Sequence, residues 1–283
     1  MSEAEQIAAK ILDFMKTAGK LAVENQNKIN FFASKIKHGG VISVVTETDL
    51  SVSKLFREFV TQEFACLNPL IVDEETVAEL GDNPLDKIRA AEYAFIIDPI
   101  DGTLPYSAKL PLYGISVGVF KNGSPYCGAL YAPALRELVY ADDKKAYAVE
   151  NAFFPDEKIQ ELKALPDDID SEPLFFASPT KVRLNSRWDK KEIVPVDMYS
   201  AVLNCIGMAK GQARGYFFQA YLWDIAGALP AFEKVGVKLL EINSGGEFSP
   251  LGEGVFNNYL KCPKVYIACR PKYFEYLRNI VKR

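Results

Sequence analysis

The spacing of hydrophobic positions changes several times along the chain. Apolar residues recur three or four positions apart over residues 4–30, which predicts a long N-terminal helix. Residues 31–41 indicate a loop. A second helix is expected to begin near Thr48 and Asp49, with one of them as its N-cap or first-turn acid. The apolar face of that helix would include Leu55, Phe56, Phe59, Val60 and Phe64.

Short apolar runs rich in β-forming residues come next. The runs at 70–72 and 93–97 predict strands, with a polar connection at 81–89 between them. The links between the following runs are so short that only an antiparallel meander accommodates them. Its strands are expected at 113–120, 125–131, 137–140 and 146–149.

Strands and helices alternate in the second half of the chain, which indicates an α/β layer. The expected order is strand 174–177, helix 198–209, strand 213–218, helix 224–235, strands 237–240 and 265–268, and a closing helix from residue 272. Residues 155–170 are charged and flanked by proline, so we expect a linker with a short helix there. We therefore divide the chain into an α+β half, residues 1–155, and an α/β half, residues 156–283.

A buried strand that ends on a carboxylate is the most informative part of the sequence. Asp98 and Asp101 follow the strand at 93–97, and Pro99 and Gly102 favour a turn there. Two carboxylates brought together on a turn resist ionisation unless a cation lies between them. A short helical turn after Gly102 would present N–H groups that can hold a phosphate. Asp-Pro and Asp-Gly are also ordinary turn dipeptides, so their spacing alone requires no metal.

Further acids stand where other elements begin or end. Asp49 and Asp224 fall at helix starts, where capping alone explains an aspartate, and Glu74-Glu75 would pass as a solvated loop after a strand. Because crevices form at such ends, these acids are also candidates to join Asp98 and Asp101 at one site.

The composition narrows the class of protein. The chain has 283 residues, of which 49% are hydrophobic and 25% charged, as in an ordinary globular protein. Its formal charge of −4 argues against a general nucleic-acid binder. The sequence has neither a membrane-spanning run nor a basic signal-peptide start. Its five cysteines include no CxxC pair. We therefore expect a cytoplasmic protein with reduced thiols. With His38 as its single histidine, the chain lacks a His-rich zinc site, which leaves a hard ion, with Mg²⁺ as the default.

The segment Gly114-Ile115-Ser116-Val117-Gly118 matches the G-x-S-x-G pattern of serine hydrolases. That pattern requires a turn from strand to helix and a later histidine. Here it lies within a predicted strand and the histidine precedes it, so the required context is missing. The sequence also contains neither a P-loop nor a Rossmann G-x-G-x-x-G.

Taken together, the acidic motifs resemble those of the inositol monophosphatase family of Mg²⁺-dependent, lithium-sensitive phosphatases. The resemblance rests on four motifs in order through nearly the whole chain: Thr46-Glu47-Thr48-Asp49, Glu74-Glu75-Thr76, Asp98-Pro99-Ile100-Asp101-Gly102-Thr103 and Trp223-Asp224-Ile225-Ala226-Gly227. It implies a layered αβαβα sandwich, with an antiparallel meander sheet in the N-terminal half and a smaller α/β sheet in the C-terminal half. It also implies a homodimer and a small phosphorylated metabolite as substrate, with no nucleic acid or membrane as partner.

The resemblance also assigns roles to individual residues. Glu74, Asp98 and the carbonyl of Ile100 would hold a first metal, and Asp98, Asp101 and Asp224 a second. Asp49 and Thr103 would orient and help deprotonate the attacking water, and the amides of Gly102 and Thr103 would bind the phosphate. The implied reaction is a two-metal in-line hydrolysis of a small phosphate monoester such as inositol 1-phosphate.

The sequence departs from the family pattern in two places. Leu104-Pro105-Tyr106 replaces the usual threonine or lysine and the polar residue after it, and the aromatic segment at 216–221 stands where inositol-cleaving members have a glutamate. Lys210-Gly211-Gln212-Ala213-Arg214 is similar to the branch that acts on 3′-phosphoadenosine 5′-phosphate. A sister phosphatase for that nucleotide or for a sugar bisphosphate is therefore an alternative, and a catalytically inert binding module on the same fold is another.

Overall fold

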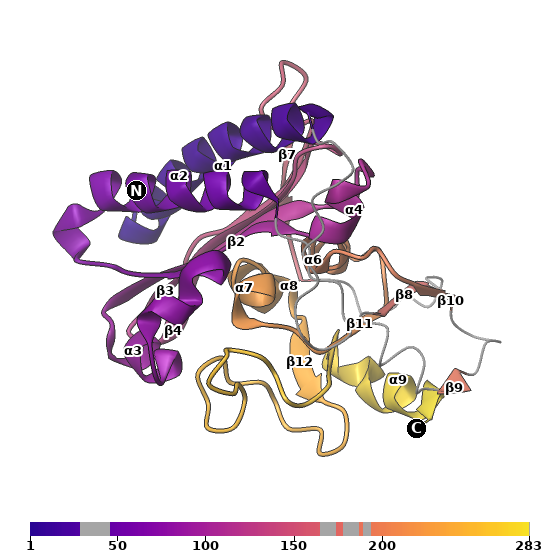
Figure 1. Ribbon diagram of the computed structural model, residues 1–283. Coiled ribbons are helices and arrows are strands. Elements are labelled where there is room, and N and C mark those ends of the chain that lie inside the picture. The colour runs from indigo at the N-terminus through magenta and orange to yellow at the C-terminus, as the bar shows by residue number, and fades with distance from the viewer. Residues whose placement is uncertain (29–45, 165–173, 178–186, 189–193, 283) are drawn as a thin grey trace.

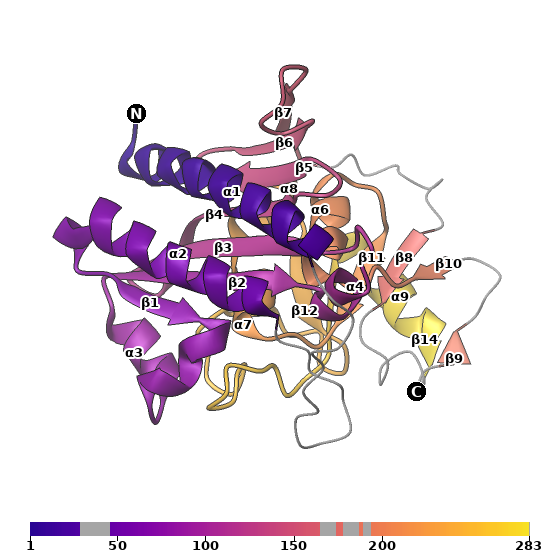
Figure 2. The ribbon, with the colours of Figure 1, turned by 45° about the horizontal axis from the view of Figure 1, so that its top comes forward.

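The computed structural model describes residues 1–28, 46–164, 174–177, 187–188 and 194–282. Within them a seven-stranded and a five-stranded sheet stack with helices between and outside them, and a two-stranded ribbon lies near the C-terminus. Figures 1 and 2 show α1 and α2 on the outer face of the larger sheet, α6, α7 and α8 beneath it, and α9 beyond the smaller sheet. The predicted αβαβα sandwich is confirmed.

The N-terminal half supplies the larger sheet. Its helices are α1 (Glu3–Lys28), α2 (Glu47–Glu63), α3 (Pro84–Ala90) and α4 (Thr103–Ser107), with 3₁₀ turns η1 (Ala65–Leu67) and η2 (Glu74–Leu80). Its strands are β1 (Leu70–Asp73), β2 (Tyr93–Asp101), β3 (Gly114–Lys121), β4 (Ser124–Ala132), β5 (Glu137–Ala141), β6 (Ala146–Glu150) and β7 (Lys158–Leu162). They lie in chain order, with β1 parallel to β2 and every later pair antiparallel, so the predicted meander is confirmed.

The C-terminal half forms the smaller, mixed sheet in the order β10-β8-β11-β13-β12. Its helices are α6 (Ala201–Ala209), α7 (Leu222–Ala226), α8 (Leu229–Val235) and α9 (Phe274–Ile280), with the 3₁₀ turn η3 (Pro271–Tyr273). Its strands are β8 (Leu174–Ala177), β9 (Arg187–Trp188), β10 (Val194–Val196), β11 (Gly215–Phe218), β12 (Lys238–Glu241), β13 (Tyr266–Cys269) and β14 (Val281–Lys282).

Strand β2 is buried on both faces, which explains its continuous apolar sequence. Its odd-numbered residues Tyr93, Phe95 and Ile97 pack into the core beneath α1 and α2. Its even-numbered residues Ala94 and Ile96 pack into the core that contains α6, α7 and α8. A polar side chain at the end of β2 therefore faces one helix layer or the other according to its position along the strand.

Several expected elements are wrong. The polar connection at 81–89 contains α3, with Pro84 in its first turn, where the missing N–H of proline has no intrahelical partner to lose. Residues 158–162 form the edge strand β7 instead of part of a linker helix, because they pair with β6. The helix expected at 224–235 is divided into α7 and α8, and Pro230 lies in the first turn of α8. Strand β2 continues to Asp101 instead of ending at residue 97.

Some expectations fall outside what the structure describes or tests. The loop at 31–41, including His38, lies outside the described residues. The division of the chain at residue 155 stays a prediction, although β7 extends the first sheet past it. All five cysteines are free thiols, and of them only Cys66 is exposed. Among the described helices, none is long and apolar enough to cross a membrane.

Candidate active site

Two parallel strands bring the first pair of acids together. β1 pairs with β2 so that Asp73, the last residue of β1, lies opposite Ile97; the next residues are Glu74, the first of η2, and Asp98 within β2. Even-numbered residues of β2 contact the core that contains α7, so the alternation of side chains directs Asp98 toward that helix. The charge of Asp224 on α7 also acts on Glu74. After burial, the charge of Glu74 is the largest cause that raises the pKa of Asp98, as expected for two neighbouring carboxyl groups.

An irregularity in β2 turns a second aspartate to the same face. Asp98 lies opposite Ser116 of β3 and Asp101 lies opposite Gly114, so three steps along β2 match two steps along β3. Side chains three residues apart on a regular strand point to opposite faces, and the additional residue of a bulge restores the same face. The bulge therefore allows both aspartates to reach one site.

Helix α7 carries the third aspartate, and it lies very close to the larger sheet. A Cβ atom at Gly118 of β3 would stand 2.5 Å from the carbonyl carbon of Ala226, so only glycine permits this approach. The Ser116 hydroxyl donates to the carbonyl of Trp223 at 2.9 Å and accepts from the N–H of Gly227 at 3.3 Å. Ser116 is fully buried in a strand, so the G-x-S-x-G pattern positions α7 and does not present a nucleophile.

Two of the aspartates use one oxygen to accept hydrogen bonds from the protein. Asp101 Oδ2 accepts hydrogen bonds from the hydroxyl of Ser200 and from the N–H of Val202, the latter at 2.6 Å. Asp224 Oδ2 accepts from the N–H of Tyr221 at 2.8 Å. Asp224 therefore caps α7 as expected, but the cap uses only one of the two carboxylate oxygens.

The remaining oxygens converge. One carboxylate oxygen from each of Asp98, Asp101 and Asp224 lies within 4.8 Å of the others. Asp98 Oδ1 is buried and has no hydrogen-bond partner among the described residues. We call Glu74, Asp98, Asp101 and Asp224 the acidic cluster.

The electrostatics of the acidic cluster oppose full ionisation. Burial, and then the charge of Glu74, raises the pKa of Asp98 well above its ordinary value, and burial with the charge of Asp224 does the same for Glu74. Burial and the charge of Asp101 raise the pKa of Asp224 to about 7. Burial also raises the pKa of Asp101, against its hydrogen bonds to Ser200 and the backbone. Such acids ionise together only when nearby positive charge compensates them.

Asp49 approaches the acidic cluster from α2. Its Oδ2 accepts from the N–H of Thr46 at 2.8 Å and from the Thr46 hydroxyl, so Thr46, not Thr48, is the N-cap and Asp49 is the expected first-turn acid. Its Oδ1 lies 3.4 Å from Thr103 Oγ1, which is also 3.0 Å from the carbonyl oxygen of Ile100. A hydroxyl has one proton, so Thr103 donates to one of these acceptors at a time. Burial raises the pKa of Asp49 to about 6.

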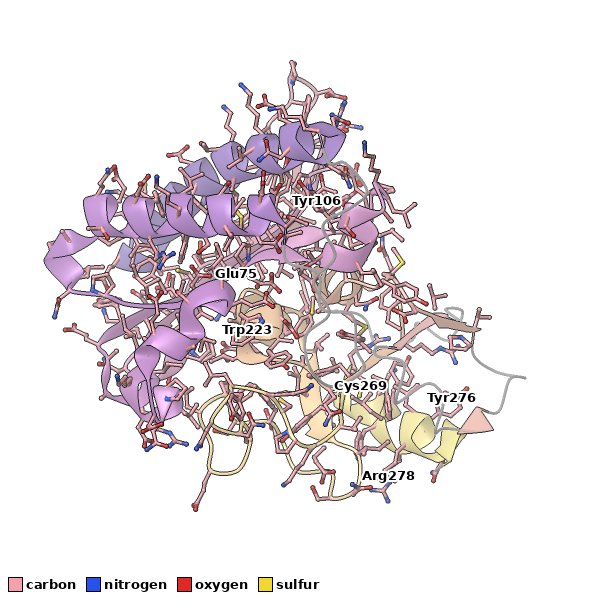
Figure 3. The ribbon with its side chains drawn as sticks, in the orientation of Figure 1. Glu75, Tyr106, Trp223, Cys269, Tyr276 and Arg278 are labelled. Atoms are coloured by element: carbon pink, nitrogen blue, oxygen red, sulfur yellow. The ribbon has the colours of Figure 1, made fainter. Side chains whose placement is uncertain are left out.

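The short helix α4 begins immediately after the bulge. Gly102 caps it with φ of 85°, in the left-handed region that favours glycine. The Tyr106 hydroxyl donates to the carbonyl of Ala22 at 2.8 Å and lies 3.0 Å from Thr48 Oγ1. Tyr106, one of the residues that depart from the family pattern, therefore ties α4 to α1 and to the first turn of α2 (Figure 3).

The sequence interpretation missed two residues beside the acidic cluster. Ser200, the N-cap of α6, binds Asp101 across the two halves of the chain. A serine before an apolar run is a recognised helix start, and that signal was available. The charge of Lys261 lowers the pKa of Asp224 against larger opposing effects. No local pattern in the sequence points to Lys261.

The aromatic segment beside Trp223 divides into two parts. Tyr216, Phe217 and Phe218 are almost fully buried in β11, so they pack the core and cannot stack on a bound base. Tyr221 is half-buried, and its ring stacks on that of Trp223 with centroids 4.7 Å apart. Strand packing thus accounts for the first part of the segment only.

Comparison with known proteins agrees with this geometry. The model of the inositol monophosphatase family matches residues 3–273. The fructose-1,6-bisphosphatase/inositol-1-monophosphatase of Thermotoga maritima is 29% identical over 232 residues, which cover 79% of this chain and 81% of that protein.

Solved structures show the same fold. The IMPase of Thermotoga maritima aligns with a TM-score of 0.72 at 21% identity, over 95% of this chain and 94% of that one. An IMPase/NADP phosphatase in complex with NADP and Ca²⁺ aligns with a TM-score of 0.74 at 17% identity, over 99% of this chain and 96% of that one. The family match covers nearly the whole chain, so this protein belongs to the inositol monophosphatase family of phosphoric monoester hydrolases.

Proposed function

We propose that this chain is a Mg²⁺-dependent phosphomonoesterase that hydrolyses the phosphate ester of a small metabolite. The observation that carries the proposal is the convergence of carboxylate oxygens from Asp98, Asp101 and Asp224 within 4.8 Å. These residues come from distant parts of the chain, and a set of oxygen donors is what Mg²⁺ prefers.

The donor set fits a divalent cation on two further grounds. Asp98 Oδ1 is buried without a hydrogen-bond partner among the described residues, although a buried carboxylate oxygen is costly to leave unpaired. The raised pKa values of Glu74 and Asp98 indicate a site that lacks positive charge. Glu74, Asp98 and the Ile100 carbonyl would hold one cation and Asp98, Asp101 and Asp224 a second. When bound, such cations supply the positive charge that attracts the phosphate and stabilises its transition state.

The groups around the acidic cluster would supply the remaining chemistry. Thr103, 3.4 Å from Asp49, would orient the attacking water, and Asp49 would accept its proton. Burial raises the pKa of Asp49 to about 6, which suits a proton acceptor that works near neutral pH. The backbone amides of Gly102 and Thr103, at the start of α4, would bind the phosphate oxygens.

The leaving alcohol need not be inositol. Residues 216–218, near the glutamate position of inositol-cleaving members, are buried aromatics, and Gln219 donates its amide to the carbonyl of Pro263 at 2.9 Å. A sister activity on a sugar bisphosphate or on 3′-phosphoadenosine 5′-phosphate is the second candidate. Lys261 beside Asp224 favours it, because both esters carry an additional anionic group. The inert binding module is disfavoured because all the proposed ligands, Asp49 and Thr103 are present.

A turnover screen with and without metal tests the proposal. The purified chain would be assayed for phosphate release from inositol 1-phosphate, sugar phosphates and 3′-phosphoadenosine 5′-phosphate. We expect hydrolysis of at least one ester, loss of activity with a chelator and recovery on addition of Mg²⁺. Activity that survives chelation, or no activity on any ester with Mg²⁺, would contradict the proposal.

A further inference from the structure

Lys261 lies at the end of a tightly bonded turn that packs against the start of α7. Asn257 Oδ1 accepts from the N–H groups of Tyr259 at 2.9 Å and of Lys261 at 3.0 Å, and the N–H of Asn257 donates to the carbonyl of Lys261 at 3.0 Å. The turn belongs to the long segment between β12 and β13, which runs below α7 in Figure 1.

Backbone pairing fixes the position of Lys261 relative to Asp224. Lys261 forms an antiparallel bridge with Tyr221, three residues before Asp224. On either side of that bridge, the N–H of Leu222 donates to the carbonyl of Leu260 at 2.8 Å, and the N–H of Cys262 donates to the carbonyl of Ala220 at 2.9 Å. The location of the Lys261 backbone is thus set by the same segment that carries the candidate metal ligand.

The ammonium group of Lys261 is held near the acidic cluster, and no carboxylate among the described residues pairs with it. Its Nζ lies 4.8 Å from the centroid of the Tyr221 ring, which in turn stacks on Trp223. Its charge lowers the pKa of Asp224. Within the part of the chain that the structure describes, the ammonium makes no ion pair or hydrogen bond. Trp223, labelled in Figure 3, lies on α7, the helix that also carries Asp224.

The ammonium group of Lys261 is a positive charge beside a site built from acids, so it can bind an anion there. When cations are bound, the charge of Asp224 is offset by them, and within the described ranges no other carboxylate pairs with Lys261. A lysine that contacts an aromatic ring and is half-buried has lost part of its hydration, so it gains from a fixed anion more than an exposed lysine does.

We propose that Lys261 is a specificity-determining residue that binds a second anionic group, a phosphate or carboxylate, on the leaving alcohol of the substrate. This inference rests on the proposed phosphatase function. It assigns the natural substrate to esters that carry a further negative charge. A base stacked on Tyr221 would compete with Lys261 and Trp223 for the faces of the same ring, so charge and not base stacking governs selection here.

Matched pairs of substrates test the inference. One pair is fructose 1,6-bisphosphate and fructose 1-phosphate, and the other is 3′-phosphoadenosine 5′-phosphate and adenosine 3′-phosphate. In at least one pair the wild-type chain should prefer the doubly phosphorylated ester. Lys261→Met keeps the aliphatic stem but removes the charge, and it should raise the KM for that ester about 10- to 100-fold while the KM for its singly phosphorylated partner and kcat stay unchanged. Lys261→Arg should restore most of the preference.

The control variant is Lys264→Met, which removes a charge from an exposed position in the same segment and should leave the preference intact. The rise in Tm on addition of Mg²⁺ should be equal in wild type and in Lys261→Met, because Lys261 is not proposed as a metal ligand. Equal losses on both members of each pair, a retained preference in Lys261→Met, or no preference in the wild type would overturn the inference alone. A wild-type chain inactive on all four esters and also on inositol 1-phosphate and the other sugar phosphates of the screen would overturn the proposed function as well.

Discussion

Glu241 and the acidic cluster are both at least half-buried, but the described part of the protein supplies hydrogen-bond donors to Glu241 and too few to the acidic cluster. Glu241, at the end of β12, is buried, and both of its oxygens are bound within the next three residues. Its Oε1 accepts from the N–H and side-chain amide of Asn243, each at 3.0 Å, and its Oε2 accepts from the N–H of Ser244 at 2.8 Å and from the Ser244 hydroxyl. Burial tends to raise the pKa of Glu241, but these hydrogen bonds outweigh it and hold the pKa below its ordinary value.

In the acidic cluster, burial and repulsion outweigh the hydrogen bonds in their effect on the pKa values. Among the described residues, Asp101 and Asp224 each accept hydrogen bonds from the protein through Oδ2 only, and Asp98 Oδ1 has no partner. Burial and mutual repulsion therefore dominate, and the pKa values rise. Burial alone does not distinguish a structural acid from a candidate ligand. The difference lies in whether the protein itself supplies enough donors for both oxygens.

The largest expected difference in activity is between a neutral variant of Asp98, from the acidic cluster, and a neutral variant of Glu241. Asp98→Asn removes a proposed ligand of both cations, so we expect kcat/KM to fall at least about a thousandfold, ~4 kcal/mol in activation free energy. Its metal-free Tm should not fall, because one repelling group is lost. Glu241→Gln should instead cost about 1–3 kcal/mol of stability, because its charge-assisted hydrogen bonds weaken, with activity unchanged.

Steady-state kinetics with saturating Mg²⁺ and thermal unfolding in chelator measure the two quantities separately. Near-wild-type activity in Asp98→Asn would remove Asp98 from the site. A loss of activity in Glu241→Gln at a temperature where the variant is folded would show that the comparison does not separate ligand acids from structural ones.

Asp224 and Glu241 are also expected to change the stability of the chain with pH in opposite directions. Asp224 has an ordinary pKa of 3.8 that burial and Asp101 raise to about 7 in the folded chain. The folded state therefore binds more protons than the unfolded state between these values, and the metal-free chain should lose stability as the pH rises from about 4 to about 7. Glu241, whose pKa is lowered, acts in the opposite direction, and its contribution is lost only as the pH falls below 4.5.

Calorimetry in chelator should show a lower Tm at pH 8 than at pH 5. The expected loss in the free energy of unfolding is on the order of a few kcal/mol, and each kcal/mol lowers Tm by roughly 2–4 °C. Asp224→Asn should flatten this decline. Mg²⁺ should reverse it, since the ionised acids then bind cations. A Tm that is independent of pH in chelator would mean that the acids do not repel one another in the folded chain.

The fold was largely predictable because most strand pairs are local. Turns of a few residues between β3, β4, β5 and β6 leave antiparallel pairing as the only arrangement. Two of the wrong expectations involve elements whose own residues show little hydrophobic pattern. β7 is mostly exposed and has no hydrophobic alternation, and it becomes a strand because β6 offers an unpaired edge. α3 is short and buries only Pro84 and Ile88.

The residue types of the candidate site were also predictable, but its geometry was not. Asp98, Asp101 and Asp224 stand out as acids at the ends of elements, and the family resemblance joins them. The bulge that turns Asp101 to the same face as Asp98 depends on the pairing with β3, which spacing along one strand does not reveal. Ser200 is 99 residues from Asp101 in sequence, so its contact arises only when the two halves of the chain pack together.

The smallest contrast compares two serines with the same local role. Ser200 donates its hydroxyl to Asp101 and accepts from the N–H of Leu203 at 3.2 Å, and Ser244 donates to Glu241 and accepts from the N–H of Gly246 at 3.1 Å. Alanine at either position should cost about 1 kcal/mol of stability, measured by denaturant unfolding.

Only Ser200→Ala should also lower kcat/KM, by about tenfold, because Asp101 loses a donor that fixes its carboxylate beside the other ligands. Its half-maximal Mg²⁺ concentration should rise as well, whereas Ser244→Ala should leave both quantities unchanged. Asp101 would retain the N–H of Val202, so the loss should be partial. If the two alanine variants lose stability equally and neither loses activity, Ser200 serves only to cap α6, and the bulge in β2 with the N–H of Val202 is enough to position Asp101.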